Sequence, residues 1–298
     1  MRLTRTKPPI PDGETEATLL EYLGAFRNVA WDDRAAAEFR NYLRSDFRRF
    51  AFTLDLVPRG TGRLLEIGAD PYFTTLLLRR FRQYELFLTN GAAPSPLDNS
   101  TELIGSGGDS VALRYAAFNM EADELPYPGR FDVVLCCEVL EHMTQDPLRA
   151  LVTINRSLRP GGALVLSTPN AARAGVVFTA AAGLPLYDAY SAYGPYGRHN
   201  REYTPSEVKK LLEHAGFRVE EEFVADVHPR PKGIKGVAMG AARAALACAR
   251  VAWSAVSGHH AEGIGAYAFF RAVKLTEPAP GRPRWLYRSY PEHELSDD

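Results

Sequence analysis

The chain has 298 residues, of which 46% are hydrophobic and 24% are charged. This composition is typical of a globular protein with one large or two small domains. Its 35 basic and 36 acidic residues give a formal charge of −1, so it lacks the basic excess of nucleic-acid-binding proteins and we expect no such partner. Three cysteines, of which Cys136 and Cys137 are adjacent, fit neither a disulfide framework nor a zinc motif.

The sequence carries no sign of export or membrane insertion. Its first 20 residues lack the apolar segment of a signal peptide, and no stretch reaches the roughly 18 consecutive apolar residues of a membrane span. Together with the cysteine pattern, this predicts a cytoplasmic protein without a transmembrane segment.

The first part of the chain predicts helices and the next part a sheet. Residues 1–15 are rich in proline and charge and are expected to be flexible, and helical spacing of apolar residues predicts a helical cap over 16–60. From Arg63, short apolar runs alternate with amphipathic segments, which is typical of a parallel sheet in an α/β protein. Proline and glycine in residues 91–110 predict a long loop.

Further along, the stretch TPSEVKKLLEHAGF predicts a helix with Thr204 as its N-cap, Glu207 three residues later and an end at Gly216. The alanine-rich segment 236–257 could lie on a membrane surface, but alanine buries little area, so we favour a packed helix. The tail 278–298 carries no clear signal.

The stretch RLLEIGADPYFTTLLL raises the first functional question. A strand that ends near Glu66, a tight turn at Gly68 and a helix that begins near Tyr72 would place a ligand at the carboxyl edge of the sheet. The turn lacks the second and third glycines that a pyrophosphate requires, so a nicotinamide-dependent dehydrogenase is a weak alternative.

Four motifs in order, LLEIGAD, FNMEADELPYPGRFDVVLCCEVLEHM, LRPGGALVLSTPN and GRHNREYTPSEVKKLLEHAGF, resemble class I S-adenosylmethionine-dependent methyltransferases. The resemblance covers about residues 60–225 and looks like the subgroup of bacterial glycan and small-molecule O-methyltransferases. It implies a Rossmann-like α/β fold with a seven-stranded sheet whose last strand is antiparallel. It also implies a methyltransferase domain over 61–277, with a lid-like insertion at about 171–203.

The resemblance also implies the cofactor, S-adenosylmethionine, and its site. Glu66 and Gly68 are expected at the methionine end, where Glu66 would bind the amino group. Asn90 stands where the family usually places an acid for the ribose. The full set of expected cofactor residues is Glu66, Gly68, Asn90, Asn119, Met120, Glu121 and Glu138.

Methyl transfer to a hydroxyl calls for alignment and, where the hydroxyl is a weak acid, a base. The candidates are His142 with Glu141, and His199 with Glu202, because an imidazole titrates near neutral pH. A packing role for either histidine stays open. A metal-assisted version would use Glu138, Glu141 and His142 to hold Mg²⁺, although their spacing is not diagnostic.

A cluster of tyrosines predicts where the acceptor binds. Aromatic faces with hydroxyl edges suit a sugar ring, so the expected substrate is a saccharide or glycoside; a lid anchor or a homo-oligomer contact is an equally open role for these tyrosines. The alternatives are a quinone or polyketide hydroxyl, or a catalytically silent cofactor-binding or assembly protein. The expected acceptor-binding residues are Tyr193, Tyr196, Arg198 and Tyr203.

Overall fold

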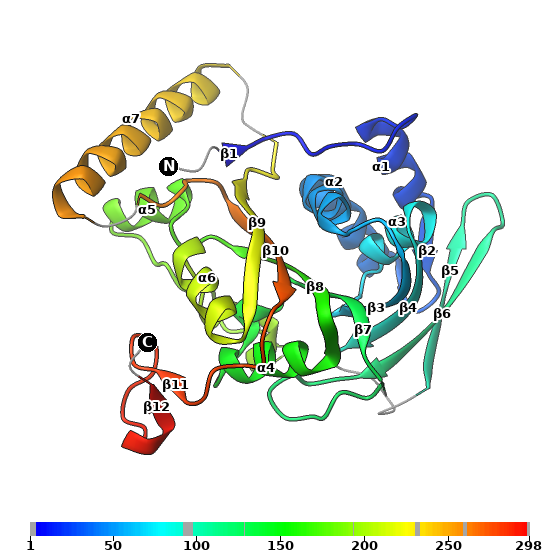
Figure 1. The fold of residues 1–298 in the computed structure, drawn as a ribbon. Coiled ribbons are helices and arrows are strands. Elements are labelled where there is room, and N and C mark those ends of the chain that lie inside the picture. Colours follow the sequence, from blue (N-terminus) through cyan, green and yellow to red (C-terminus); the bar gives the residue numbers. More distant parts are fainter. Residues whose placement is uncertain are drawn as a thin grey trace.

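A computed structural model of the protein describes residues 4–91, 98–127, 129–192, 194–229, 233–258 and 261–296. Ten strands of these residues form one mixed sheet with helices on both faces (Figure 1). In spatial order the strands are β1 (Thr4–Arg5), β9 (Phe217–Ala225), β10 (Tyr267–Lys274), β8 (Leu158–Pro169), β7 (Phe131–Cys137), β3 (Thr61–Ile67), β4 (Gln83–Asn90), β6 (Ser110–Ala117), β5 (Asn99–Gly105) and β2 (Phe26–Asn28).

The centre of the sheet is parallel, as the alternating pattern predicts. Strand β3 pairs in parallel with both β4 and β7, and β7 pairs in parallel with β8. Strand β10 runs antiparallel to both of its neighbours, which confirms the expected direction of the last strand.

The expected count of seven strands is wrong, because both edges are extended. On one side β1 pairs with β9, although residues 1–15 are expected to be flexible. On the other side β5 lies where a loop is expected and forms an antiparallel hairpin with β6, and β2 adds to it. Strands β1 and β2 pair with distant segments, so no local periodicity reveals them.

The helices are α1 (Glu16–Gly24), α2 (Asp33–Leu56), α3 (Phe73–Phe81), α4 (Pro147–Ser157), α5 (Ala174–Ala181), α6 (Pro205–His214) and α7 (Gly233–Ser257). Helices α1, α2 and α3 cover one face of the sheet, and α4 and α6 cover the other (Figure 1). Consecutive residues of β7 point alternately into these two cores, as the period of a strand requires.

Two helix starts follow from their cap residues. The side chain of Thr204 accepts from the backbone N–H of Glu207, whose carboxylate accepts from the N–H of Thr204, which confirms the capping box of α6. Helix α4 begins after Asp146, whose carboxylate accepts from two backbone N–H groups. The turn after α6 passes through Gly216 at φ +85°, as expected of a glycine at a helix end.

Helix α7 and the C-terminal tail pack against the body to different degrees. The helix expected over 236–257 is present, but none of its residues is fully buried, and it contacts the body along one face only. The tail forms β11 (Arg282–Pro283), the 3₁₀ helix η3 (Glu292–Glu294) and β12 (Leu295–Ser296). Its Tyr287 is buried and donates to Asp146 over 2.6 Å.

No helix within the described ranges has the length and apolarity needed to cross a bilayer.

Candidate active site

The carboxyl ends of β3, β4 and β7 meet at one edge of the sheet, and three cavities open there. Their volumes are about 100, 380 and 410 Å³, and Gly68 lines all three. Glu138 lines the first two, so these cavities meet between Gly68 and Glu138. We call them the methionine-side cavity, the central cavity and the ribose-side cavity.

The turn after β3 requires glycine. Gly68 has φ +70°, and a Cβ placed there would lie 3.2 Å from Cγ2 of Val139. The backbone N–H of Gly68 donates to the carbonyl of Thr89 at the end of β4, over 2.9 Å. A side chain would therefore strain the turn and occupy the space that the three cavities share.

Glu66 points into the methionine-side cavity as a buried carboxyl group. It accepts a hydrogen bond of 2.6 Å from the hydroxyl of Thr75, and no cation of the described residues pairs with it. Burial raises its pKa to about 8. A carboxyl in this state suits a ligand that brings its own positive charge, such as the ammonium group of a methionine moiety.

Arg49 is a site residue that sequence reasoning missed. It reaches the methionine-side cavity from α2 and forms an ion pair of 2.8 Å with Glu138. Burial lowers the pKa of Arg49, but the charge and hydrogen bond of Glu138, together with Tyr267 and Glu141, outweigh this and raise it overall. Ser167 also donates to Glu138, over 2.7 Å, which fixes this carboxylate at the junction of the two cavities.

Of the expected cofactor residues Asn119, Met120 and Glu121, the first two line one cavity and the third does not. Asn119 and Met120 line the central cavity, and Asn119 donates to the hydroxyl of Tyr196 over 3.1 Å. Glu121 does not line it. Its carboxylate instead accepts from the backbone N–H groups of the loop at 144–146, because three unpaired N–H groups there converge on it.

Asn90 lines the ribose-side cavity, but both ends of its amide are already engaged. Its oxygen accepts from the N–H of Asp70 over 3.0 Å, and its nitrogen donates to the hydroxyl of Tyr72 over 2.9 Å. Asp70 lines the same cavity, and burial raises its pKa to about 6. The structure therefore brings in Asp70, which sequence reasoning missed, as a second polar group on the ribose side.

His142 lies in the 3₁₀ helix η1 (Leu140–His142) and lines the central cavity. Its Nδ1 lies 2.9 Å from the carbonyl oxygen of Arg198. Because a carbonyl can only accept, Nδ1 carries the proton and Nε2 is left with a lone pair. Burial lowers the pKa of His142 further than the Arg198 carbonyl raises it, so the ring is neutral at pH 7.

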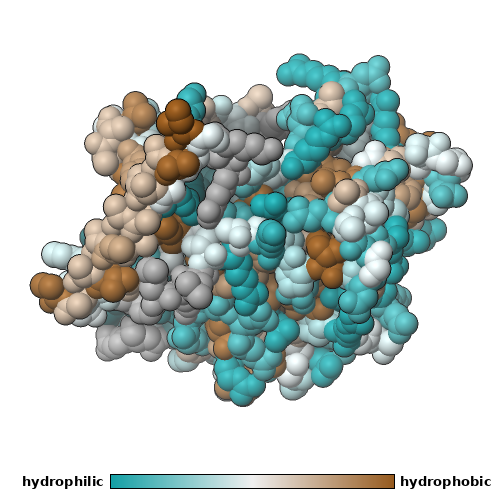
Figure 2. Space-filling view, turned by 90° about the horizontal axis from the view of Figure 1, so that it is seen from above, coloured by the Kyte–Doolittle hydropathy of each residue, from teal (hydrophilic) through white to brown (hydrophobic). Residues whose placement is uncertain are grey.

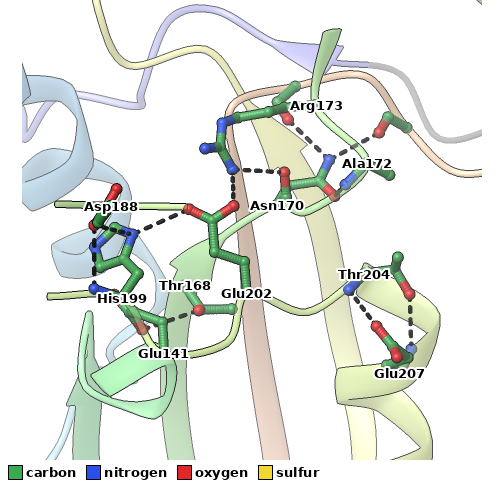
Figure 3. A network of polar contacts seen from close by, with 12 residues as sticks. Glu141, Thr168, Asn170, Ala172, Arg173, Asp188, His199, Glu202, Thr204 and Glu207 are labelled. Atoms are coloured by element: carbon green, nitrogen blue, oxygen red, sulfur yellow. Dashed lines mark hydrogen bonds and ion pairs between the residues drawn. The ribbon is translucent and has the colours of Figure 1, made fainter. Parts of the chain in front are cut away.

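His199 has the opposite electrostatic character. Its Nδ1 lies 3.0 Å from Glu202 and 3.7 Å from Asp188, and the hydrogen bond with Glu202 raises its pKa. Arg173 pairs with the other oxygen of Glu202 (Figure 3). The two imidazole rings pack edge to face with centroids 5.1 Å apart, so a histidine favoured as a cation stands beside the neutral His142.

Glu141 is completely buried below these rings. One of its oxygens accepts from Thr168 over 3.0 Å, and the other has no hydrogen-bond partner among the described residues (Figure 3). Burial and the charge of Glu138 both raise the pKa of Glu141. A proton or a cation would satisfy the unpaired oxygen.

Two of the three expected metal ligands, together with His199, could share a metal. Ligand atoms of Glu141, His142 and His199 all lie within 4.8 Å of one another. Glu138 is not part of this group, because Arg49 holds it. Two imidazoles and one carboxylate suit zinc or a similar transition ion better than the magnesium expected from the sequence.

The residues expected to bind the acceptor separate in space. Tyr196 lines the central cavity. Arg198 instead lies over the ring of Tyr190, and Tyr203 is 1% exposed within a hydrophobic core, which argues against a contact with the acceptor. Tyr193 falls outside the described residues. The insertion contains α5 and the 3₁₀ helix η2 (Pro195–Gly197), and its action as a lid stays a prediction.

Several curated proteins are similar to part of this chain. The ubiquinone biosynthesis O-methyltransferase of Methylococcus capsulatus is 34% identical over 85 residues, 27% of this chain and 35% of that protein. The enzyme of the same name from Vibrio cholerae is 30% identical over 119 residues, 40% of this chain and 46% of that protein. This chain thus spans between a third and a half of the length of these curated relatives.

A solved structure supports the fold. A chain in the complex of the Haloferax volcanii Trm112 methyltransferase activator with a methyltransferase superposes with a TM-score of 0.53. The match has 14% sequence identity and covers 86% of this chain and 98% of that chain. The methyltransferase domain family matches residues 36–222, which include α2, the turn at Gly68 and the segment with both histidines. The chain therefore belongs to the S-adenosylmethionine-dependent methyltransferases.

Proposed function

We propose that the protein transfers a methyl group from S-adenosylmethionine to the hydroxyl of a small aromatic molecule of the quinol or phenol type. The observation that carries this proposal is His142, a neutral imidazole with Nδ1 fixed by a carbonyl and the basic Nε2 beside the central cavity. The chain's own residues would supply alignment and proton removal.

S-adenosylmethionine supplies an electrophilic methyl group on a sulfonium. We propose that Glu66 holds its ammonium group and that Gly68 lets the methionine moiety lie against the backbone. Glu138, at the junction of the two cavities, would stand near the sulfonium, and its negative charge favours a cationic ligand there. Asn119 and Met120 would contact the adenine, and Asp70 or Asn90 the ribose.

His142 would accept the proton of the acceptor hydroxyl as the oxygen attacks the methyl carbon. His199, with Glu202 and Arg173 behind it, would position the neighbouring ring and favour the anionic oxygen. The proton leaves on His142 and passes to solvent, which balances the loss of the positive charge on sulfur.

The strength of the base favours an aromatic acceptor over the saccharide expected from the sequence. Burial lowers the pKa of His142, so it is a weak base. The pKa of a phenolic hydroxyl, about 10 in tyrosine, is much closer to the pKa of an imidazole than that of an aliphatic hydroxyl is, so a weak base removes its proton more readily. Apolar side chains of Ile67, Phe118, Val139 and Met143 also line the central cavity. The matched relatives are named for ubiquinone biosynthesis, which agrees with this choice.

The test is a methyl-transfer assay with a labelled cofactor and a panel of catechols, hydroquinones, glycosides and free sugars. We expect turnover on an ortho-dihydroxyaromatic acceptor and none on sugars. Turnover on sugars alone would overturn the choice of acceptor, and cofactor binding without turnover on any acceptor would favour the silent cofactor-binding alternative.

A metal-assisted version is a second candidate, favoured by the unpaired oxygen of Glu141. Because Arg198 occupies Nδ1 of His142, only Nε2 is left, and it can act as a base or as a ligand but not both. Assays after treatment with a chelator, then with added zinc or magnesium, separate the two. Unchanged activity in the chelator supports the base; loss and recovery with metal supports the ligand.

A further inference from the structure

Helix α7 is an exposed apolar surface outside the site. It runs for 25 residues, yet none of them is buried. In Figure 2 it forms a tan and brown band along one side of the molecule, where Figure 1 places α7 away from the sheet. Its exposed apolar residues, with the exposed share of each, are Ile234 (89%), Val237 (75%), Met239 (50%), Val251 (46%), Trp253 (66%) and Val256 (83%).

One stripe of the helix faces the body of the protein. Arg243 pairs with Asp226 over 2.7 Å, and Arg250 donates to the carbonyl of Glu262 over 3.3 Å. These two arginines lie seven residues apart, so they share a face, and Ile234, Val237 and Val256 lie on the half of the helix turned away from it. The polar contacts hold α7 in place with its apolar side turned outward, the reverse of an ordinary surface helix.

The charge around α7 is one-sided. Residues 227–261 contain no aspartate or glutamate, although the whole chain has a net charge of −1. They contain Arg230, Lys232, Lys235, Arg243 and Arg250. A basic segment joined to an exposed apolar helix is complementary to a surface that is both apolar and negatively charged.

We propose that α7 docks the protein onto the surface of an anionic phospholipid bilayer. The apolar face would lie among the acyl chains near the head groups, and Lys235 at the start of the helix would contact a lipid phosphate. A second copy of this chain is a poorer occupant, since a symmetric contact through α7 would bring two basic segments together.

The exposed apolar segment near α7 extends the same surface. Phe178 of α5 is 40% exposed and faces α7 across a cavity of about 270 Å³, which Met239 and Gly240 also line. Leu184 and Leu186, 58% and 49% exposed, follow α5 in the chain and lead into the segment that ends at His199.

The experiment is co-sedimentation with vesicles of phosphatidylcholine, with and without roughly one third phosphatidylglycerol. The full chain should bind the anionic vesicles, and more weakly as salt is raised. The triple variant Val237→Ser, Trp253→Ser and Val256→Ser should lose at least about tenfold in binding, because three large apolar side chains no longer leave water. The variant Lys235→Glu should weaken binding to anionic vesicles alone.

The matched control carries the same kind of change elsewhere: Val29→Ser, Ile104→Ser and Leu275→Ser, at positions 54%, 46% and 62% exposed. It should bind vesicles like the unchanged protein. Equal binding by both triple variants, or no binding by the unchanged protein, would overturn the proposal. So would light scattering that shows a dimer which the α7 variant alone converts to a monomer. Methyl transfer to a water-soluble acceptor should stay unchanged, so failure here is distinct from failure of the proposed reaction.

Discussion

The carboxyl groups in the two halves of the site differ in whether a cation of the protein pairs with them. On the proposed cofactor side, Glu66 is buried and Asp70 is more exposed. Neither pairs with a cation of the described residues, and loss of solvation raises the pKa of both, to about 8 and about 6. On the acceptor side, burial raises the pKa of Glu202, but hydrogen bonds from His199 and Arg173 outweigh it and keep this group ionised. The carboxyl groups of the first half lack a cationic partner that a ligand could supply. The carboxylate of the second half already has its partners within the chain.

The acceptor half is tested most strongly at His142. His142→Ala should lower kcat by roughly 10²- to 10⁴-fold, the usual contribution of a positioned base, and leave the affinity for S-adenosylhomocysteine unchanged by calorimetry. The acidic limb of kcat should lie below pH 6.5, because the pKa of His142 is lowered from that value and a base must be unprotonated.

His142→Asn is the matched control, because its amide can still donate to the carbonyl of Arg198 but offers no base. It should be as inactive as the alanine variant. Recovery of most of the activity by asparagine would assign His142 to positioning and remove it from proton transfer.

The two halves meet at the ion pair of Arg49 and Glu138. Arg49→Met should destabilise the fold by about 3–5 kcal/mol in urea unfolding, because it leaves a carboxylate buried without its partner. The double variant Arg49→Met with Glu138→Gln should regain part of this loss. If the two changes simply add, the pair does not couple the halves.

The cofactor half is tested at its turn. Gly68→Val should weaken the binding of S-adenosylhomocysteine by roughly 10- to 200-fold, the range seen when a pocket loses room for a small group. Gly183→Val is the control, because Gly183 has a similar φ of +68° and nothing within 4 Å of an added Cβ. Equal loss in both variants would point to backbone strain and away from a ligand site.

The buried carboxyls should also shape the dependence of stability on pH. The folded-state pKa of Glu66 is raised from 4.5 to about 8, so its favourable contribution is complete below pH 4.5 and is lost as the pH rises towards 8. The slope from this group is about 1.4 kcal/mol of unfolding free energy per pH unit. Glu66→Gln should reduce the slope of the unfolding free energy against pH by that amount. An unchanged slope would contradict the conclusion that Glu66 is protonated at neutral pH.

The smallest effect is expected at the contact between the halves, where Asn119 donates to Tyr196. Tyr196→Phe should raise the KM of the acceptor roughly two- to tenfold, since it loses one neutral hydrogen bond. Tyr190→Phe, at a position 91% exposed, is the control. A change in cofactor affinity with a constant acceptor KM would move Tyr196 to the cofactor half.

Several features of the site were predictable because their signals are local. The glycine turn, the capping box of α6 and the apolar strands each depend on a few neighbouring residues. The parallel strands then carry Glu66, Asn90 and Glu138 to one edge, since their carboxyl ends must meet there.

Other features were decided only by packing between distant segments. Helix α2 contains five arginines that the sequence alone does not tell apart, and only the tertiary structure turns Arg49 inward to Glu138, 89 residues further along the chain. The proton position on His142 depends on the Arg198 carbonyl 56 residues away, and Glu121 is drawn from the cavity by backbone N–H groups at 144–146. A local pattern contains no information about such partners, because each is set by which surfaces come together when the sheet closes. The sequence by itself therefore determined the class of fold and the edge that carries the site, while the tertiary structure decided which groups there are paired, neutral or free to react.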